Sequence, residues 1–308
     1  MTELTYSDIE AAAARITGRV RPVTVAPADE EGHVFALEFM QHTGTFKARG
    51  AQNFIQAHLA EGTFPEAGVT IASGGNAGLA CAWAARAAGV PATVFLPTTA
   101  PSVKVERLRS YGARVELVGS EFAEAAAACQ EFVDSSGALA SHAYDHPLIA
   151  AGAGTLMTEI LAQVPDLDTV VVSVGGGGLF AGVATAATHH GVRTVAVEPE
   201  NCRALNAAIE AGEPVDVTVD SVAADSLGAR RATPLALEAA RSDLVTSVLV
   251  GDNAIVEARQ RLWDEHRLAV EHAAATALAG VSGVGYVPAE GEKVCVVLCG
   301  ANTSLGEL

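Results

Sequence analysis

The chain contains only three lysines, and one of them has surroundings that suit chemistry. Lys104 stands in SVKVERLRSYG with two arginines, and Lys293 follows the turn-like GEK, so both are predicted to lie on the surface. Lys47 stands in QHTGTFKARG, among small residues and beside Phe46. Taking an amine out of water lowers its pKa and makes it a nucleophile for an aldehyde. This segment alone is equally compatible with a surface lysine in a turn.

A run of four glycines, 175–178, follows the apolar stretch TVVVSV and precedes a predicted helix. Glycines leave backbone N–H groups uncovered, and a helix N-terminus adds the positive end of its dipole. The run therefore predicts a cradle for an anion, most often a phosphate. A plain glycine-rich turn is the simpler alternative, although an ordinary turn rarely needs four consecutive glycines.

The same run also permits a dinucleotide site. Gly176, Gly178 and Ala181 fit the pattern G-x-G-x-x-[GA]. Glu198 ends the next predicted strand, where an acid would bind a ribose. An NAD-dependent oxidoreductase is therefore the main alternative by spacing alone.

A second glycine-rich loop, Ser73-Gly74-Gly75-Asn76-Ala77, joins another predicted strand to another predicted helix. It offers a helix N-terminus, a hydroxyl and an amide, which together suit a carboxylate. Two anion cradles and one isolated lysine describe a site that holds a phosphate and a carboxylate around an amine.

Short β-rich runs alternate with alanine-rich helical runs along most of the chain. This alternation predicts a parallel α/β architecture with helices on both faces of the sheet. The predicted strands are 69–73, 91–97, 113–119, 169–174, 192–198, 244–250 and 293–299, and the predicted helices are 77–88, 102–111, 121–135, 253–267 and one that starts at residue 179.

Composition and charge argue against several classes of protein. A formal net charge of −17, with 19 scattered Lys and Arg residues, lacks the basic face that nucleic-acid binding needs. Five scattered cysteines without a C-x-x-C pair argue against a disulfide framework or zinc ribbon and favour the cytoplasm. The acidic N-terminus is unlike a signal peptide, and no apolar run approaches the roughly 20 residues that span a membrane.

Taken together, these motifs resemble the fold type II pyridoxal phosphate (PLP) enzymes, and among them the serine/threonine dehydratases. The resemblance extends from about Leu37 to Ser304 and is specific because the motifs occur jointly and in family order. QHTGTFKARGA resembles the Schiff-base motif, SGGNAG the substrate-carboxylate loop and SVGGGGL the phosphate loop. VAVEPE, SVAADSLGA, VEHAAATALAG and VVLCGANTS follow. The dinucleotide reading explains only one of these segments.

The resemblance implies a role for each motif. Lys47 would be the Schiff-base lysine and would shuttle the Cα proton, with Phe46 packed beside the ring. Ser73 and the N–H groups of residues 74–77 would hold the substrate carboxylate. Asn76 would hydrogen-bond the ring hydroxyl, and Gly175, Gly176, Gly177 and Gly178 would bind the phosphate.

Cys299 would face the ring nitrogen of the cofactor. A neutral thiol there makes the ring a weaker electron sink than a carboxylate would, which favours prompt loss of the β-hydroxyl. The plain alternative is a buried core cysteine, the commoner fate of a cysteine in a strand.

Two departures from related racemases bear on the reaction. Those relatives carry a serine, which acts as an acid on the second face of the ring, where this chain has Gly74. They also hold a divalent metal with an acid where this chain has Ala204. The resemblance therefore implies a dehydratase rather than a serine racemase. It leaves room for a monovalent cation held by Glu198.

With 308 residues, the chain is long enough for two lobes. The resemblance implies a tryptophan synthase β-like fold, with a large PLP-binding domain (1–58 and 146–308), a small substrate-loop domain (59–145), no appended regulatory domain and a homodimeric state. The implied reaction converts L-serine to pyruvate, or L-threonine to 2-oxobutyrate, with release of ammonia. A serine racemase and a dehydratase of another β-hydroxy amino acid remain alternatives, as do an NAD-dependent oxidoreductase and a non-catalytic PLP-binding protein.

Overall fold

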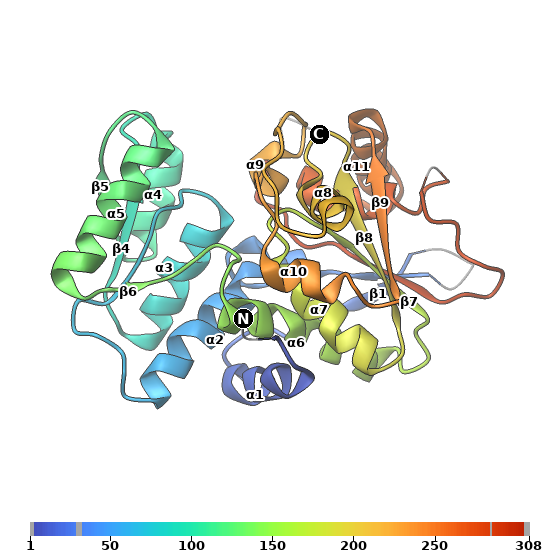
Figure 1. Ribbon diagram of the computed structural model, residues 1–308, viewed down its shortest axis with the longest axis horizontal. Coiled ribbons are helices and arrows are strands. Elements are labelled where there is room, and N and C mark those ends of the chain that lie inside the picture. Colours follow the sequence, from blue (N-terminus) through green and yellow to red (C-terminus); the bar gives the residue numbers. More distant parts are fainter. Residues whose placement is uncertain (1–2, 29–32, 284, 305–308) are drawn as a thin grey trace.

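The computed structural model of the chain describes residues 3–28, 33–283 and 285–304, and it arranges the strands in two separate sheets (Figure 1). The larger sheet has six strands in the order β1-β2-β10-β7-β8-β9. Its members come from both ends of the chain: β1 (Val25–Pro27), β2 (Val34–Ala36), β7 (Thr169–Ser173), β8 (Arg193–Pro199), β9 (Val245–Val250) and β10 (Val294–Val297).

The smaller sheet has four parallel strands in the order β5-β4-β3-β6 and lies at the left of Figure 1. It is formed by one continuous stretch of the chain, coloured teal to green. Its strands are β3 (Val69–Ile71), β4 (Ala92–Leu96), β5 (Arg114–Leu117) and β6 (Leu139–Ala140).

Helices alternate with the strands in both halves, as the pattern of the sequence predicts. The first seven are α1 (Tyr6–Ile16), α2 (Lys47–Ala60), α3 (Asn76–Ala88), α4 (Ser102–Ser110), α5 (Phe122–Ser136), α6 (Pro147–Gln163) and α7 (Gly178–His189). The others are α8 (Ala204–Ala211), α9 (Ala224–Leu227), α10 (Pro234–Ala239), α11 (Asp252–His266) and α12 (His272–Ala279), with 3₁₀ turns η1 (Glu38–Met40) and η2 (His42–Gly44). In the described part of the chain, no helix combines the length and the apolar character that a membrane span requires.

The predicted parallel α/β architecture is confirmed, with one departure. Strand β1 pairs antiparallel with β2, at the edge of the larger sheet. A short connection between two strands can only return the chain in the opposite direction, whereas a parallel crossover needs a dozen or more residues. The domain boundaries at 58/59 and 145/146 stay a prediction, and α2 (Lys47–Ala60) runs across the first of them.

The core of the larger half forms because its central strands are apolar on both faces. All residues of β7 and β10 are buried, as expected for parallel strands covered by helices on both sides. Glycines let two of the covering helices, α6 and α7, approach closely. A Cβ on Gly182 would lie 2.2 Å from the Ala150 carbonyl oxygen, and one on Gly154 would lie 2.8 Å from the Gly182 carbonyl oxygen.

A buried cation ties α2, which begins at Lys47, to its neighbours. The Arg49 side chain is fully buried and forms an ion pair with Glu38 of η1, with Nε at 2.7 Å from Oε1. Its two terminal nitrogens donate to both carboxylate oxygens of Glu159 on α6, each at 2.8 Å. Such paired geometry fixes orientation as well as distance. The start of α2 is therefore held in one place relative to α6.

Replacement of Arg49 by Ala should strongly destabilise the fold, because it leaves the buried Glu38 carboxylate without its cation. We expect a loss of about 3–5 kcal/mol in the free energy of unfolding, measured by chemical denaturation. As a control, Arg241→Ala breaks the exposed pair with Glu238 and should cost at most about 1 kcal/mol. Equal losses in both variants would contradict a special role for the Arg49 network.

Candidate active site

A cavity of about 730 Å³ collects segments that lie far apart in the sequence. It is lined by the start of α2, by the loops that follow β3 and β7, and by Cys299, the second residue after β10. All the predicted site residues except Glu198 line this cavity: Phe46, Lys47, Ser73, Gly74, Gly75, Asn76, Ala77, Gly175, Gly176, Gly177, Gly178 and Cys299.

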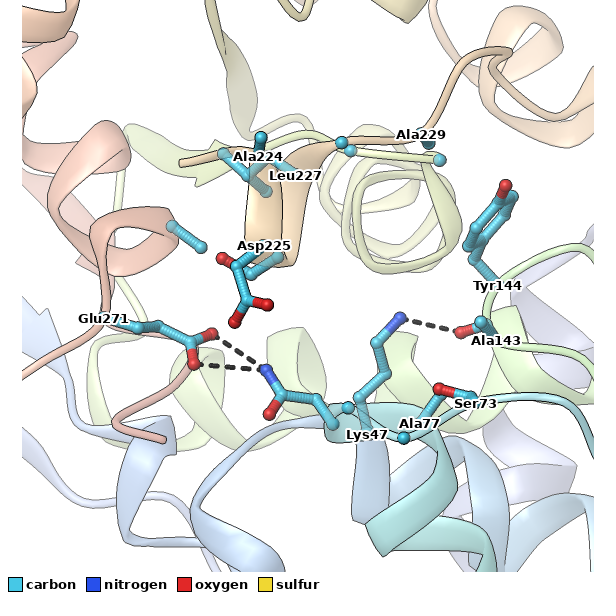
Figure 2. Close-up of a pocket in the computed structure, with 18 of the residues that line it drawn as sticks. Lys47, Ser73, Ala77, Ala143, Tyr144, Ala224, Asp225, Leu227, Ala229 and Glu271 are labelled. Carbon is cyan, nitrogen blue, oxygen red and sulfur yellow. Dashed lines mark hydrogen bonds between the residues drawn. The ribbon is translucent and has the colours of Figure 1, made fainter. Parts of the chain in front are cut away.

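Lys47 is held at the cavity by the backbone that precedes it. The Phe46 N–H donates to the Cys299 carbonyl oxygen at 3.0 Å, and Thr45 forms an isolated bridge with Gly300. The Lys47 amine then reaches across the cavity and donates to the Ala143 carbonyl oxygen at 2.7 Å (Figure 2).

Burial lowers the pKa of Lys47 to about 8, against the opposing influence of Cys299 and Glu271. The amine also lies 4.8 Å from the centre of the Phe46 ring, an apolar neighbour that faces it. At neutral to mildly alkaline pH a substantial share of this amine is unprotonated, which a nucleophile for an aldehyde requires. The surface-lysine alternative for Lys47 is therefore wrong.

The loop from Ser73 to Ala77 leads from β3 into the N-terminus of α3. The first turn of a helix has N–H groups without intrahelical acceptors, so this loop can bind an anion. Gly78 makes the approach possible, because a Cβ there would lie 1.8 Å from the Ser73 carbonyl oxygen. The predicted carboxylate loop thus faces the same cavity as the amine.

The glycine run 175–178 leads from β7 into α7, as predicted. Gly177 has a φ of 96°, which favours glycine. A Cβ on Gly176 would lie 2.3 Å from the Tyr144 ring, and a Cβ on Gly178 would lie 2.8 Å from the Tyr144 carbonyl oxygen. These glycines therefore let the loop pack directly against the segment that holds the Lys47 amine.

Cys299 lies just after β10, where its side chain is 3% exposed. Its sulfur is 3.7 Å from the Ser173 hydroxyl, and burial raises the pKa of the thiol to about 12. Cys299 is buried, but it also lines the cavity as a neutral group. The contact with a cofactor ring nitrogen stays a prediction.

Glu271 is a buried carboxylate that the sequence analysis did not assign to the site. Both of its oxygens accept from the Asn76 amide nitrogen at 3.1 Å, while Asn302 donates to the Asn76 oxygen at 2.6 Å. Burial raises the pKa of Glu271. In the sequence, Glu271 immediately precedes the helical run HAAATALA, so it is hard to distinguish from a helix cap. Asn76 therefore has two protein partners in addition to the ring hydroxyl predicted for it.

Three further residues, Asp225, Lys104 and Tyr144, line the cavity without having been predicted there. Asp225 on α9 is directed toward Glu271 (Figure 2). Its carboxylate pairs with the Lys104 amine of α4 at 3.4 Å. The prediction that Lys104 belongs to a solvated face is thus incomplete. Its side chain is 42% exposed, but it lies at the mouth of the cavity and lines it.

Glu198 is the one predicted site residue that lies apart from this cavity. Its buried carboxylate accepts the N–H groups of Leu205 and Asn206, at 2.7 and 2.8 Å, and so caps α8. Burial raises its pKa to about 7. Among the described residues, no group of three or more His, Cys, Asp or Glu side chains could hold a metal ion. The cation at Glu198 stays a prediction.

Comparison with known proteins agrees with this geometry. A family model described as pyridoxal-phosphate dependent enzyme matches residues 19–300. An L-threonine ammonia-lyase from Geobacter sulfurreducens is 38% identical over 87% of the chain, and the chain spans 66% of that relative's length. A serine dehydratase-like protein from Mus musculus is 37% identical, over 86% of the chain and 83% of that protein. A structure of maize serine racemase superimposes with a TM-score of 0.90 and 30% identity, covering 99% and 96% of the two chains.

Replacement of Gly176 by Ala should weaken binding of pyridoxal phosphate, because the new Cβ collides with the Tyr144 ring. Overpacking of this kind costs about 1–3 kcal/mol, so we expect roughly a ten- to hundredfold higher Kd, measured by absorbance titration of the apo-protein. The control is Gly251→Ala at the junction of β9 and α11, where a Cβ would lie 3.6 Å from Glu200 Oε2. Unchanged affinity in Gly176→Ala would show that the run does not hold the phosphate.

Proposed function

Because the chain belongs to the pyridoxal-phosphate-dependent enzymes, we propose that it is a dehydratase that eliminates water from L-serine or L-threonine. Hydrolysis of the released unsaturated amine then takes up water and frees ammonia. The products would be pyruvate and 2-oxobutyrate. One observation carries the proposal: the Lys47 amine, the 73–77 loop and the 175–178 run line a single cavity. The similarity to proteins named threonine ammonia-lyase and serine dehydratase-like supports the same reaction.

The residues present fit the cofactor. The glycine run offers uncovered N–H groups at the N-terminus of α7, and side chains at Gly176 or Gly178 would collide with Tyr144. Lys47 supplies an amine whose pKa is lowered to about 8, and Cys299 supplies a neutral thiol at the cavity wall. When bound, pyridoxal phosphate supplies an electron sink for the bond that breaks at the substrate Cα.

Lys47 is the group that moves the proton. Its Nζ takes the Cα proton of the substrate as a general base, and the low dielectric around it keeps the neutral form accessible near pH 8. The Ala143 carbonyl oxygen, 2.7 Å away, holds the amine in the cavity when the amine is a donor. Lys47 therefore combines anchoring of the cofactor with proton transfer, as the resemblance implies.

Ser73 and the N-terminus of α3 orient the substrate. The Ser73 hydroxyl and the N–H groups of residues 74–77 would bind its carboxylate, which sets the Cα–H bond toward the amine. Leu96 lines the other side of this loop, because a Cβ on Gly74 would lie 2.9 Å from its Cδ2 atom. No hydroxyl is available at Gly74 to donate a proton from the opposite side, which favours elimination over racemisation.

We also propose a cytoplasmic location and a homodimer. All five cysteines are free and buried, which agrees with a reducing compartment. The homodimer rests on the resemblance alone, and sedimentation of the full chain would test it.

The purified enzyme should release 2-oxoacid and ammonia from L-serine or L-threonine, and Lys47→Ala should lower kcat by at least about 1000-fold. Lys293→Ala is the matched control, because Lys293 pairs with Asp166 on the surface and should leave turnover unchanged. The measurement is 2-oxoacid release across a panel of β-hydroxy amino acids. Activity only toward some other member of the panel would correct the substrate, and absence of release with bound cofactor would refute the reaction.

Gly74→Ser should introduce D-serine formation from L-serine, because it places a hydroxyl where the chain has none. The new side chain meets only the flexible end of Leu96, so the loop should keep its shape. Chiral chromatography of the products measures the effect, and Gly75→Ser, one residue away in the same loop, should give no D-serine. Faster racemisation than dehydration by the unaltered enzyme would overturn the argument from Gly74.

A further inference from the structure

The segment that joins β6 to α6 contains an unusual turn. Here one ring nitrogen, His142 Nδ1, accepts two backbone N–H groups: that of Tyr144 at 3.2 Å and that of Asp145 at 2.8 Å. The arrangement resembles an Asx-turn, in which a side-chain acceptor closes a turn in its own backbone. The shape of residues 142–145 therefore depends on a lone pair of one histidine.

The same turn contacts both halves of the proposed cofactor site. Ala143, inside the turn, presents its carbonyl oxygen to the Lys47 amine at 2.7 Å. The centre of the Tyr144 ring lies 5.8 Å from that amine, and the ring occupies the space beside Gly176, while the Tyr144 backbone lies beside Gly178. Figure 2 shows Ala143 and Tyr144 on the same side of the Lys47 amine. A change in the turn would therefore move the partner of the amine and the wall behind the glycine run together.

We propose that His142 is a positioning residue for Lys47, acting through the Nδ1 acceptor that closes the turn around Ala143. The His142 ring is not itself part of the cavity wall; it acts through the backbone that it orients. The inference deepens the proposed cofactor site and does not depend on which substrate is used.

The acceptor role requires a neutral ring with its proton on Nε2. A protonated imidazole has two N–H donors and no acceptor, so protonation opens the turn. Although the ring keeps contact with solvent, partial burial lowers its pKa; the charge of Lys47 on α2 lowers it further, and Asp145 in the turn opposes both. His146, which follows in the same segment, is also ionisable, and its pKa is lowered by burial and by His58 and His142.

The direction of the pH effect follows from the sign of this shift. Because the pKa of His142 in the folded protein lies below its ordinary value of 6.5, the turn is complete above that pH. It is lost as the pH falls through the lower, folded-state pKa. Lys47 loses its neutral form over a different range, since its pKa is about 8. The two titrations are therefore separable.

His146 provides a matched control in the same segment. Its Nδ1 also accepts a backbone N–H two residues ahead, that of Leu148 at 3.1 Å, and so caps α6. Its ring packs edge-on against Phe54, with ring centres 4.9 Å apart, rather than against the turn. Loss of this second histidine removes the same kind of hydrogen bond without touching the carbonyl that faces Lys47.

The test compares four proteins: the unaltered chain, His142→Ala, His142→Asn and His146→Ala. The Oδ1 atom of asparagine stands at the same number of bonds from Cβ as Nδ1 of histidine, so asparagine can close the turn but does not titrate. The readout is the rate at which each apo-protein takes up pyridoxal phosphate between pH 5 and 8. Uptake is followed by absorbance and is assigned to Lys47 by borohydride fixation and peptide mapping.

We expect His142→Ala to take up the cofactor about tenfold more slowly at pH 8, because a positioning hydrogen bond is lost. His142→Asn should stay within about twofold of the unaltered protein there. The cofactor and Lys47 titrate in the same way in the unaltered protein and in His142→Asn. The uptake rate of the unaltered protein divided by that of His142→Asn therefore isolates the titration of His142. That ratio should be constant above pH 7 and fall, by up to about tenfold, as the pH drops through the folded-state pKa of His142, which lies below 6.5. His146→Ala should lower thermal stability but not uptake at pH 8.

Each contrary result overturns the proposal. Slow uptake by His142→Asn, equal to that of His142→Ala, would exclude the acceptor role. A flat ratio at pH values where NMR of the ring shows His142 to be protonated would show that the charge of His142 does not reach Lys47. Equal slowing in His146→Ala would indicate general destabilisation instead. The assay needs no substrate: failure of all four proteins to bind the cofactor would refute the cofactor site itself, and normal uptake without 2-oxoacid release would refute only the proposed reaction.

Discussion

The structure of this site depends on one constraint. The amine of Lys47 must be taken out of water and yet remain able to act as a nucleophile and as a base. Burial disfavours the charged form and brings the pKa to about 8. An unpartnered buried amine would be costly, so a backbone oxygen from a different part of the chain, that of Ala143, accepts a hydrogen bond from it.

Rigid support for the amine comes from outside the cavity. The buried Arg49 joins α2 to η1 and α6 two residues after Lys47. A buried cation with two carboxylate partners contributes little net stability compared with apolar packing, but it fixes orientation strongly. On the opposite side, the turn around Ala143 fixes the carbonyl. Lys47 is therefore supported from two sides. The ion pairs of Arg49 fix the helix that carries it, and the hydrogen-bonded turn around Ala143 fixes the carbonyl that its amine contacts.

Two buried glutamates, Glu198 and Glu271, have different roles in the structure. Both are buried and both have raised pKa values, because burial disfavours their charged forms. Glu198 accepts two backbone N–H groups and completes the start of α8, whereas Glu271 accepts the Asn76 amide at the cavity. Glu198 stands out in the sequence because it ends a strand after a glycine run, a position typical of dinucleotide sites. Its capping of α8 gives the carboxylate a structural use instead.

The sequence by itself determined the features that local physics specifies. Alternation of apolar strands with alanine-rich helices predicted parallel sheets, and strands such as β7 and β10 agree with it because burial on both faces requires continuous apolar runs. The glycine loops and the segment around Lys47 could also be predicted from the sequence, because each is a short stretch with a distinct conformational requirement. Helices α2 and α6 were not predicted. Helix α2 begins inside the motif around Lys47, and α6 is predominantly apolar, so its helical periodicity is weak.

Only the tertiary structure decided which distant side chains line the cavity together with the Lys47 amine. Glu271, Asp225 and Lys104 come from three separate elements, and Tyr144 fills its place because two glycines leave room for it. Nothing in their neighbouring residues distinguishes a carboxylate at a cavity from one that caps a helix or faces water. Their roles are set by contacts between segments that folding brings together, and a single sequence does not encode those contacts in any local pattern.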